Sequence, residues 1–182
     1  MRRIDIRPGF ALFVLALAYF DTARLFFPYF SAAALHEGGH LLALWGLRGQ
    51  LQRVTLGFGD VQIRTAPLPP GAEALCALAG PAANLLCAGL FLRILPEFAG
   101  VSLALGAFNL LPIFPLDGGR LLRLALRSTR AARQWELFVG LLCCAALLAL
   151  GLWAARRLQT GLWVLLPALI PAARLLRSCD GI

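Results

Sequence analysis

The chain has 182 residues, of which 60% are hydrophobic and 14% are charged. Because soluble domains carry charge on about a quarter of their residues, this composition excludes an ordinary soluble globular protein, and it equally excludes disordered and collagen-like chains. The remaining class is an integral membrane protein, and the length allows about six spanning helices of roughly 20 residues each.

The net charge is +8, and all 17 basic residues are arginines. A basic chain can bind nucleic acid, but this sequence offers no soluble domain with a binding face, so we expect no nucleic-acid partner. Arginines instead collect in cytoplasmic loops. Most of them fall on one side of a six-span arrangement, which predicts that both termini lie in the cytoplasm.

The apolar segments predict a single all-α polytopic membrane domain over residues 1–182, with about six transmembrane helices. The first two spans are expected at about residues 9–28 and 30–47. Residues 51–65 then mix polar and β-branched side chains around a Gly-Phe-Gly-Asp turn, which predicts a short membrane-associated β-hairpin after the second helix. The other spans are expected at about 72–95, 98–116, 135–155 and 158–173.

Four arginines recur at helical spacing after the fourth span, at Arg120, Arg123, Arg127 and Arg130, with leucines between them. This pattern predicts a helix whose arginine face meets anionic lipid headgroups at the cytoplasmic surface. Ordinary positive-inside charge explains the arginines equally well.

The cysteines are Cys76, Cys87, Cys143, Cys144 and Cys179. Four lie in apolar runs, their number is odd, and no CxxC pair occurs. This pattern is typical of small buried hydrophobic residues and argues against a disulfide framework or a four-thiolate zinc site.

The two histidines of the chain, His36 and His40, bracket Glu37 in the sequence His-Glu-Gly-Gly-His. Positions i and i+4 share one face of a helix, so both imidazoles can reach one metal ion. Glu37 lies about 100° around the helix from His36, where it can accept a proton from an attacking water without being a ligand. A charged group inside a spanning helix costs about 2.5–3.5 kcal/mol on insertion scales, which favours a zinc site over a hydrogen-bonded packing cluster.

A catalytic zinc ion usually has three protein ligands, and the chain has no third histidine. Asp117 is the candidate, because two prolines precede it and two glycines follow it, a pattern that predicts a bent or unwound helix end at membrane depth. The residues alone leave an alternative open, in which Asp117 is a polar helix-end residue that faces cytoplasmic water.

Together these motifs resemble the site-2 protease family of intramembrane zinc metalloproteases (peptidase family M50). That family combines HExxH in an early span with an Asn-x-x-Pro-x-x-Pro-Leu-Asp-Gly-Gly segment in a later one, and residues 109–119 read Asn-Leu-Leu-Pro-Ile-Phe-Pro-Leu-Asp-Gly-Gly. The sequence is most similar to the sporulation branch, which processes pro-sigma-K in spore-forming bacteria. Members of that branch often carry a C-terminal CBS domain, for which we expect no counterpart in these 182 residues; we expect no PDZ domain either.

The resemblance implies that His36, His40 and Asp117 bind one Zn²⁺ per chain and that Glu37 is the general base. It also implies a catalytic role for Asn84, the last residue of a Gly-Pro-Ala-Ala-Asn element, as a hydrogen-bond donor to the substrate carbonyl or to the oxyanion. An interhelical hydrogen bond is the alternative role for this side chain.

Two further features follow from the same resemblance. Asn109 matches a family position, where it would contact the substrate or brace the bent span. The hairpin of residues 51–65 is similar to a strand region that pairs with an extended substrate by strand addition.

The resemblance therefore implies a zinc metalloendopeptidase of the bacterial cytoplasmic membrane, with its active site toward the cytoplasmic side. Its substrate would be a protein cleaved in or next to a membrane-associated segment, such as a membrane-tethered pro-sigma or anti-sigma factor. The expected partners are this substrate, the lipid bilayer and a regulatory membrane protein; the oligomeric state is not predicted.

Two alternative functions stay open beside this one. Another HExxH membrane metalloprotease, acting on prenylated or misfolded proteins, would generally need a glutamate ligand on a later helix, and Glu97 and Glu136 lie at span ends. A non-catalytic metal-binding membrane protein is the second alternative, although the general base and all three candidate ligands are present.

Overall fold

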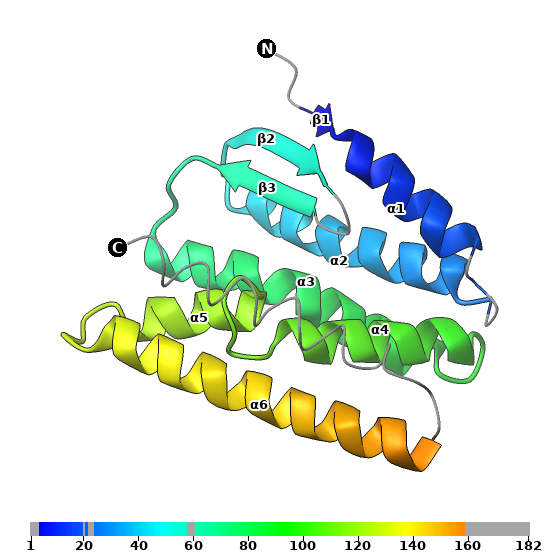
Figure 1. Ribbon diagram of the computed structural model, residues 1–182. Coiled ribbons are helices and arrows are strands. Elements are labelled where there is room, and N and C mark those ends of the chain that lie inside the picture. The colour runs from blue at the N-terminus through cyan, green and yellow to red at the C-terminus, as the bar shows by residue number, and fades with distance from the viewer. Residues whose placement is uncertain (1–3, 20, 22–23, 58–60, 159–182) are drawn as a thin grey trace. The chain divides into compact units, whose positions relative to one another are not determined.

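The computed structural model describes residues 4–19, 21, 24–57 and 61–158. Within these residues, six helices and three strands follow one another in the order β1-α1-α2-β2-β3-α3-α4-α5-α6 (Figure 1). The chain divides into two compact units, residues 1–108 and residues 109–182.

The sheet of the first unit has three strands in the order β1-β2-β3. Strands β2 (Leu51–Leu56) and β3 (Val61–Thr65) are antiparallel (Figure 1), which confirms the predicted hairpin; residues 58–60 of its turn lie outside the described residues. Strand β1 (Ile4–Ile6) pairs in parallel with β2, so that Ile4 lies opposite Val54. This strand was not predicted, because three residues carry too little alternation to indicate a strand.

Helices α1 (Pro8–Tyr19) and α2 (Phe26–Gly46) share the region predicted as the first two spans. The predicted first span, residues 9–28, is divided near Asp21. The carboxylate of Asp21 accepts hydrogen bonds from the backbone N–H groups of Leu25, at 2.7 Å, and Phe26, at 2.9 Å. The first N–H groups of a helix lack partners within it, so this carboxylate stabilises the start of α2.

Helix α3 (Pro70–Phe91) packs against α2 at a close approach of small residues. A Cβ atom at Gly39 of α2 would lie 2.6 Å from the carbonyl oxygen of Ala79 and 3.1 Å from the Cβ atom of Ala83. Glycine therefore lets the two backbones come together here, as small residues do in membrane helices.

Helix α4 (Pro96–Asn109) is 14 residues long and ends within the predicted fourth span, residues 98–116. It packs on α3 at Gly106, where a Cβ atom would lie 3.1 Å from the Cβ atom of Asn84. The next helix begins at Asp117, so the chain between the two helices is irregular. This confirms the helix interruption predicted from the two prolines.

The second unit contains α5 (Asp117–Leu126) and α6 (Ala132–Leu158), which pack against each other. Helix α5 confirms the predicted helix for Arg120 and Arg123, but it ends at Leu126, before Arg127 and Arg130. Arg123 of α5 forms a two-pronged ion pair with Glu136 of α6, at 2.5 and 3.2 Å, and its guanidinium lies 4.0 Å from the centroid of the Phe114 ring. The planar guanidinium suits both contacts.

Six membrane spans were predicted, and the described residues contain two helices long and apolar enough to cross a bilayer: α3 and residues 132–150 of α6. Helices α1 and α4 have 12 and 14 residues, fewer than the roughly 20 that a span needs. The predicted fifth span, residues 135–155, lies within α6. The predicted sixth span, residues 158–173, lies almost wholly outside the described residues, which end at 158.

The four cysteines within the described residues are free thiols. Cys76 and Cys144 are buried, and Cys87 and Cys143 are half-buried. Their prediction as buried small hydrophobic residues is confirmed for the two buried thiols, and Cys179 lies outside the described residues.

Candidate metal centre

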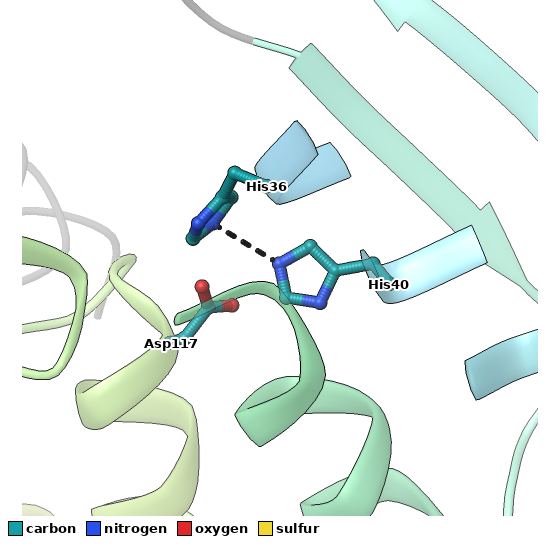
Figure 2. A group of neighbouring side chains, drawn as sticks. All are labelled: His36, His40 and Asp117. Atoms are coloured by element: carbon teal, nitrogen blue, oxygen red, sulfur yellow. Dashed lines mark hydrogen bonds between the residues drawn. The ribbon is translucent and has the colours of Figure 1, made fainter. Parts of the chain in front are cut away.

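The imidazoles of His36 and His40 lie on one face of α2, as their spacing predicts. Both are buried, with 5% and 9% of their surface exposed. Their Nε2 atoms are 3.2 Å apart (dashed line in Figure 2), and the rings meet edge to face. Two nitrogen donors are thus side by side within the first unit.

The Nδ1 atom of each imidazole contacts an oxygen atom of α3. His36 Nδ1 lies 2.8 Å from Oδ1 of Asn84, and His40 Nδ1 lies 2.7 Å from the backbone carbonyl oxygen of Cys76. The close packing of α2 on α3 brings these groups together. Metal-binding histidines almost always use their second ring nitrogen in this way, because the contact fixes the orientation of the ring.

Asn84 is completely buried, and it contacts α2 at two points. Besides its contact with His36, its Nδ2 atom donates a hydrogen bond to the carbonyl oxygen of Ala32, at 3.0 Å. The interhelical hydrogen bond that the sequence left open as an alternative role for Asn84 is therefore present.

Gly80 of α3 provides the space that the His40 ring occupies. A Cβ atom at Gly80 would meet Nε2 of this ring and would lie 2.6 Å from its Cε1 atom. Neither Gly80 nor the Cys76 carbonyl was predicted from the sequence to contact the imidazoles. Backbone groups leave no trace in a sequence pattern, although a glycine directly before a proline inside an apolar helix is a signal of a close approach.

Glu37 lies in α2 between the two histidines and is half-buried. A helix places it about 100° from His36, which keeps its carboxylate off the face shared by the imidazoles. This position allows it to act beside a metal ion rather than as one of its ligands.

Asp117 is the first residue of α5, in the second unit, and is buried. The irregular segment before it is held by a hydrogen bond from Leu116 N–H to the carbonyl oxygen of Ile113, at 2.8 Å. Its carboxylate lies 3.6 Å from the guanidinium of Arg120, one turn along the helix. A carboxylate at a helix N-terminus is also favoured by the helix dipole.

Asn109, the predicted substrate contact, is the last residue of α4 and is half-buried. It stands at the point where the helix stops and the irregular segment begins. This place in the chain suits either of its predicted roles.

The chemistry of these side chains fits a zinc ion. Zinc binds imidazole nitrogen at about 2.0–2.1 Å in tetrahedral geometry, so two such nitrogens lie about 3.3 Å apart, close to the 3.2 Å between the two Nε2 atoms. His36 and His40 of the first unit offer imidazole nitrogens, and Asp117 of the second unit offers a carboxylate; these side chains, drawn in Figure 2, are of the types that bind a metal ion. Two histidines and one carboxylate are typical of catalytic zinc sites with an open position.

Comparison with known proteins points to one family. The sequence model of peptidase family M50 matches residues 93–150, which include Asp117. A zinc metalloprotease from Methanocaldococcus jannaschii is 31% identical over 116 residues, covering 56% of this chain and 34% of that protein. The comparisons support peptidase family M50.

A solved structure has a similar fold. The site-2 protease from Methanocaldococcus jannaschii superposes with a TM-score of 0.70 at 22% sequence identity, covering 96% of this chain and 89% of that one. The chain spans about a third of the length of the zinc metalloprotease it matches in sequence. That relative is named a zinc metalloprotease, and its sequence identity to this chain is distant.

Proposed function

We propose that this chain is a zinc endopeptidase of peptidase family M50 that acts within a membrane. The observation that carries the proposal is the pair of buried imidazoles of His36 and His40, whose Nε2 atoms lie 3.2 Å apart on α2, with Glu37 between them in sequence. An HExxH helix with this arrangement is the core of a zinc metalloprotease.

Three side chains would hold the zinc ion: His36, His40 and, as the third ligand, Asp117. The donor chemistry supports Asp117, because two imidazoles and one carboxylate leave a position open for water or substrate. When bound, the zinc ion supplies Lewis-acid chemistry that polarises a carbonyl group and acidifies water.

Glu37 would be the general base. Its carboxylate accepts a proton from the attacking water and passes it to the departing amine nitrogen, so that one group serves both halves of peptide hydrolysis. Its half-buried position, off the face shared by the imidazoles, supports a role beside the reacting atoms rather than on the metal.

Exposed apolar side chains support a membrane location. On α2, Leu42 and Trp45 have 69% and 81% of their surface exposed, and on α3 Leu86 and Leu90 have 67% and 72%. Such surfaces are unfavourable in water and suit lipid. The lipid bilayer is accordingly the first partner that we propose.

The proposed substrate is a membrane-associated protein that binds in extended form. Helical carbonyl groups are hydrogen-bonded and shielded, so a segment must unwind before its peptide bond can be attacked. Strand β3 supports this proposal, because it lies at an edge of the three-stranded sheet and can pair with an extended segment.

The finer assignments rest on sequence patterns. The distribution of arginines supports the cytoplasmic membrane, with both termini and the active site on the cytoplasmic side. The likeness of residues 109–119 to the sporulation branch makes a membrane-tethered pro-sigma or anti-sigma factor the candidate substrate. A regulatory membrane protein is a further candidate partner.

Substitution of the general base tests the activity. Glu37→Gln keeps the shape of the side chain and removes its ability to accept the proton, so we expect cleavage to fall by at least the roughly 10²–10⁴-fold that a general base contributes. Zinc content should be unchanged. The measurement is coexpression of either form with epitope-tagged, membrane-tethered candidate substrates from the same organism, followed by immunoblotting for shortened products.

Chelator treatment of membranes that contain the unsubstituted protein is the control, and added zinc should restore cleavage. Retained cleavage by the Glu37→Gln protein would contradict the role of Glu37. A purified protein that takes up no zinc would contradict the metalloprotease itself.

A further inference from the structure

The orientation of the Asn84 amide is determined by its two contacts. Its Nδ2 atom lies 3.0 Å from the carbonyl oxygen of Ala32, and a carbonyl oxygen only accepts hydrogen bonds. The amide nitrogen must therefore face Ala32, which turns the amide oxygen, Oδ1, toward Nδ1 of His36 at 2.8 Å.

The positions of the imidazole protons follow from these acceptors. Oδ1 of Asn84 accepts, so Nδ1 of His36 must carry a proton and donate it. The carbonyl oxygen of Cys76 also accepts, so Nδ1 of His40 carries a proton as well. A neutral imidazole has one N–H group, and in both rings it is therefore at Nδ1.

In the neutral rings both Nε2 atoms consequently carry a lone pair and no proton, and they lie 3.2 Å apart. Two lone pairs at this distance repel each other unless a cation lies between them. If either ring carried its proton on Nε2 instead, it could donate to the other ring, and that hydrogen bond would occupy both nitrogens. The acceptors on α3 exclude this competing arrangement.

Helix α3 is suited to supply these acceptors. Pro81 has no N–H group, so the carbonyl of Ala77 receives no helical hydrogen bond from it. The residues before this proline include Cys76, whose carbonyl accepts from His40, and Gly80, which leaves space for the ring of His40. Asn84 follows one turn later.

We propose that Asn84 is a positioning residue, which holds His36 in the Nδ1-protonated tautomer and so directs the Nε2 lone pair to the metal ion. The Cys76 carbonyl does the same for His40. This inference rests on the metal site of the proposed function and gives Asn84 a role through His36 in place of the predicted contact with the substrate.

The first test observes the imidazoles directly. The chain has two histidines, so selective ¹⁵N labelling of histidine reports on His36 and His40 alone. In chelator-treated protein, at a pH where the rings are neutral, we expect nitrogen shifts and couplings of Nδ1–H tautomers for both rings. A proton on Nε2 of His36 would overturn the proposal.

The second test compares two substitutions of Asn84. Asn84→Leu has a similar volume but no acceptor, and we expect zinc affinity to fall by about 10–100-fold, the usual cost of losing such a contact. Asn84→Asp keeps an acceptor oxygen, so we expect it to recover most of this loss. Cobalt binding, followed by the ligand-field absorption of Co²⁺, should show a changed spectrum for Asn84→Leu and a nearly parental one for Asn84→Asp.

Ser102→Ala is the matched control for changing a buried polar group in the same unit. Ser102 is completely buried in α4, and its hydroxyl is the buried side-chain group without a hydrogen-bond partner within the described residues. We expect parental zinc affinity from this variant.

Three outcomes separate the positioning role from the proposed function. The inference would be overturned if a folded Asn84→Leu protein had parental zinc affinity. It would also be overturned if Asn84→Leu and Asn84→Asp lost zinc affinity equally, because either result would show that Asn84 is only a packing residue. An unsubstituted protein that binds neither zinc nor cobalt would overturn the proposed function, and with it the metal that Asn84 is proposed to serve. Because none of these measurements uses cleavage, failure to find a substrate leaves their outcome unchanged.

Discussion

Gly80 shows how strongly a single residue can constrain this site. The absence of a side chain lets the His40 ring lie directly against α3, with its Nδ1 atom 2.7 Å from the Cys76 carbonyl. A methyl group at this position would occupy the space of the ring itself. The position is therefore constrained by a contact with another helix rather than by the conformation of its own backbone.

We predict that Gly80→Ala displaces the His40 ring and lowers zinc affinity by at least tenfold, since the new Cβ atom would lie 2.6 Å from Cε1 of that ring. Loss of the contact between Nδ1 of His40 and the Cys76 carbonyl is by itself enough to lower zinc affinity about tenfold. The measurement is a zinc titration of chelator-treated protein in detergent, with circular dichroism to verify the helical content.

Gly89→Ala is the control, because Gly89 lies in the same helix with nothing within 4 Å of its added Cβ atom. Its zinc affinity should be parental. Equal affinity in the Gly80→Ala protein would show that His40 does not need this position, and would contradict the geometry of the site.

At the scale of the helices, α2 and α3 form the structure on which the two imidazoles depend. The two variable positions of HExxH, Gly38 and Gly39, have different surroundings although the motif treats them alike. Gly39 is buried against α3, and Gly38 has nothing within 4 Å of an added Cβ atom.

We predict opposite effects of the same substitution at these two positions. Gly39→Ala places its Cβ atom 2.6 Å from the Ala79 carbonyl oxygen and should lower the free energy of unfolding by about 1–3 kcal/mol, as overpacking does. Gly38→Ala should raise it by up to about 1 kcal/mol, because alanine favours the helix more than glycine does.

Thermal unfolding of both variants in the same detergent measures this difference. If the Gly39→Ala protein were as stable as the Gly38→Ala protein, α2 and α3 would not approach each other closely at Gly39.

Helix interruption by proline is, by contrast, predictable from the sequence, and α4 does end at Asn109 before the two prolines.

At the scale of the whole molecule, the three proposed zinc ligands are far apart in the chain. His36 and His40 belong to the first unit and Asp117 to the second. The family comparison covers Asp117, since the M50 match begins at residue 93, after the HExxH segment. The match therefore includes the segment that carries Asp117 and does not depend on the HExxH motif.

Loss of a side chain that only contacts a zinc ligand lowers zinc affinity by roughly 10–100-fold. We predict a larger loss for Asp117→Ala, because this substitution removes a proposed ligand itself. Metal content after dialysis against zinc-buffered solution measures the effect. Glu97→Ala removes an exposed carboxylate from the first turn of α4 and is the matched control. Parental zinc affinity in the Asp117→Ala protein would mean that a different group is the third ligand.

The sequence by itself determined the local features of this protein. The i, i+4 spacing put both imidazoles on one face of a helix, the mixture of polar and β-branched residues around a glycine-containing turn in residues 51–65 indicated the hairpin, and the prolines before Asp117 indicated the end of α4. Each of these depends on neighbours within a few residues, whose geometry the backbone sets.

Only the tertiary structure decided which groups approach the imidazoles and which strand completes the sheet. Asn84 contacts His36 across 48 positions of sequence, and Ile4 pairs with Val54. Such contacts depend on how closely two elements pack, which Gly39 and Gly80 control through the volume they leave empty. Volume at an interface is a property of both surfaces together, so neither segment of sequence specifies it alone.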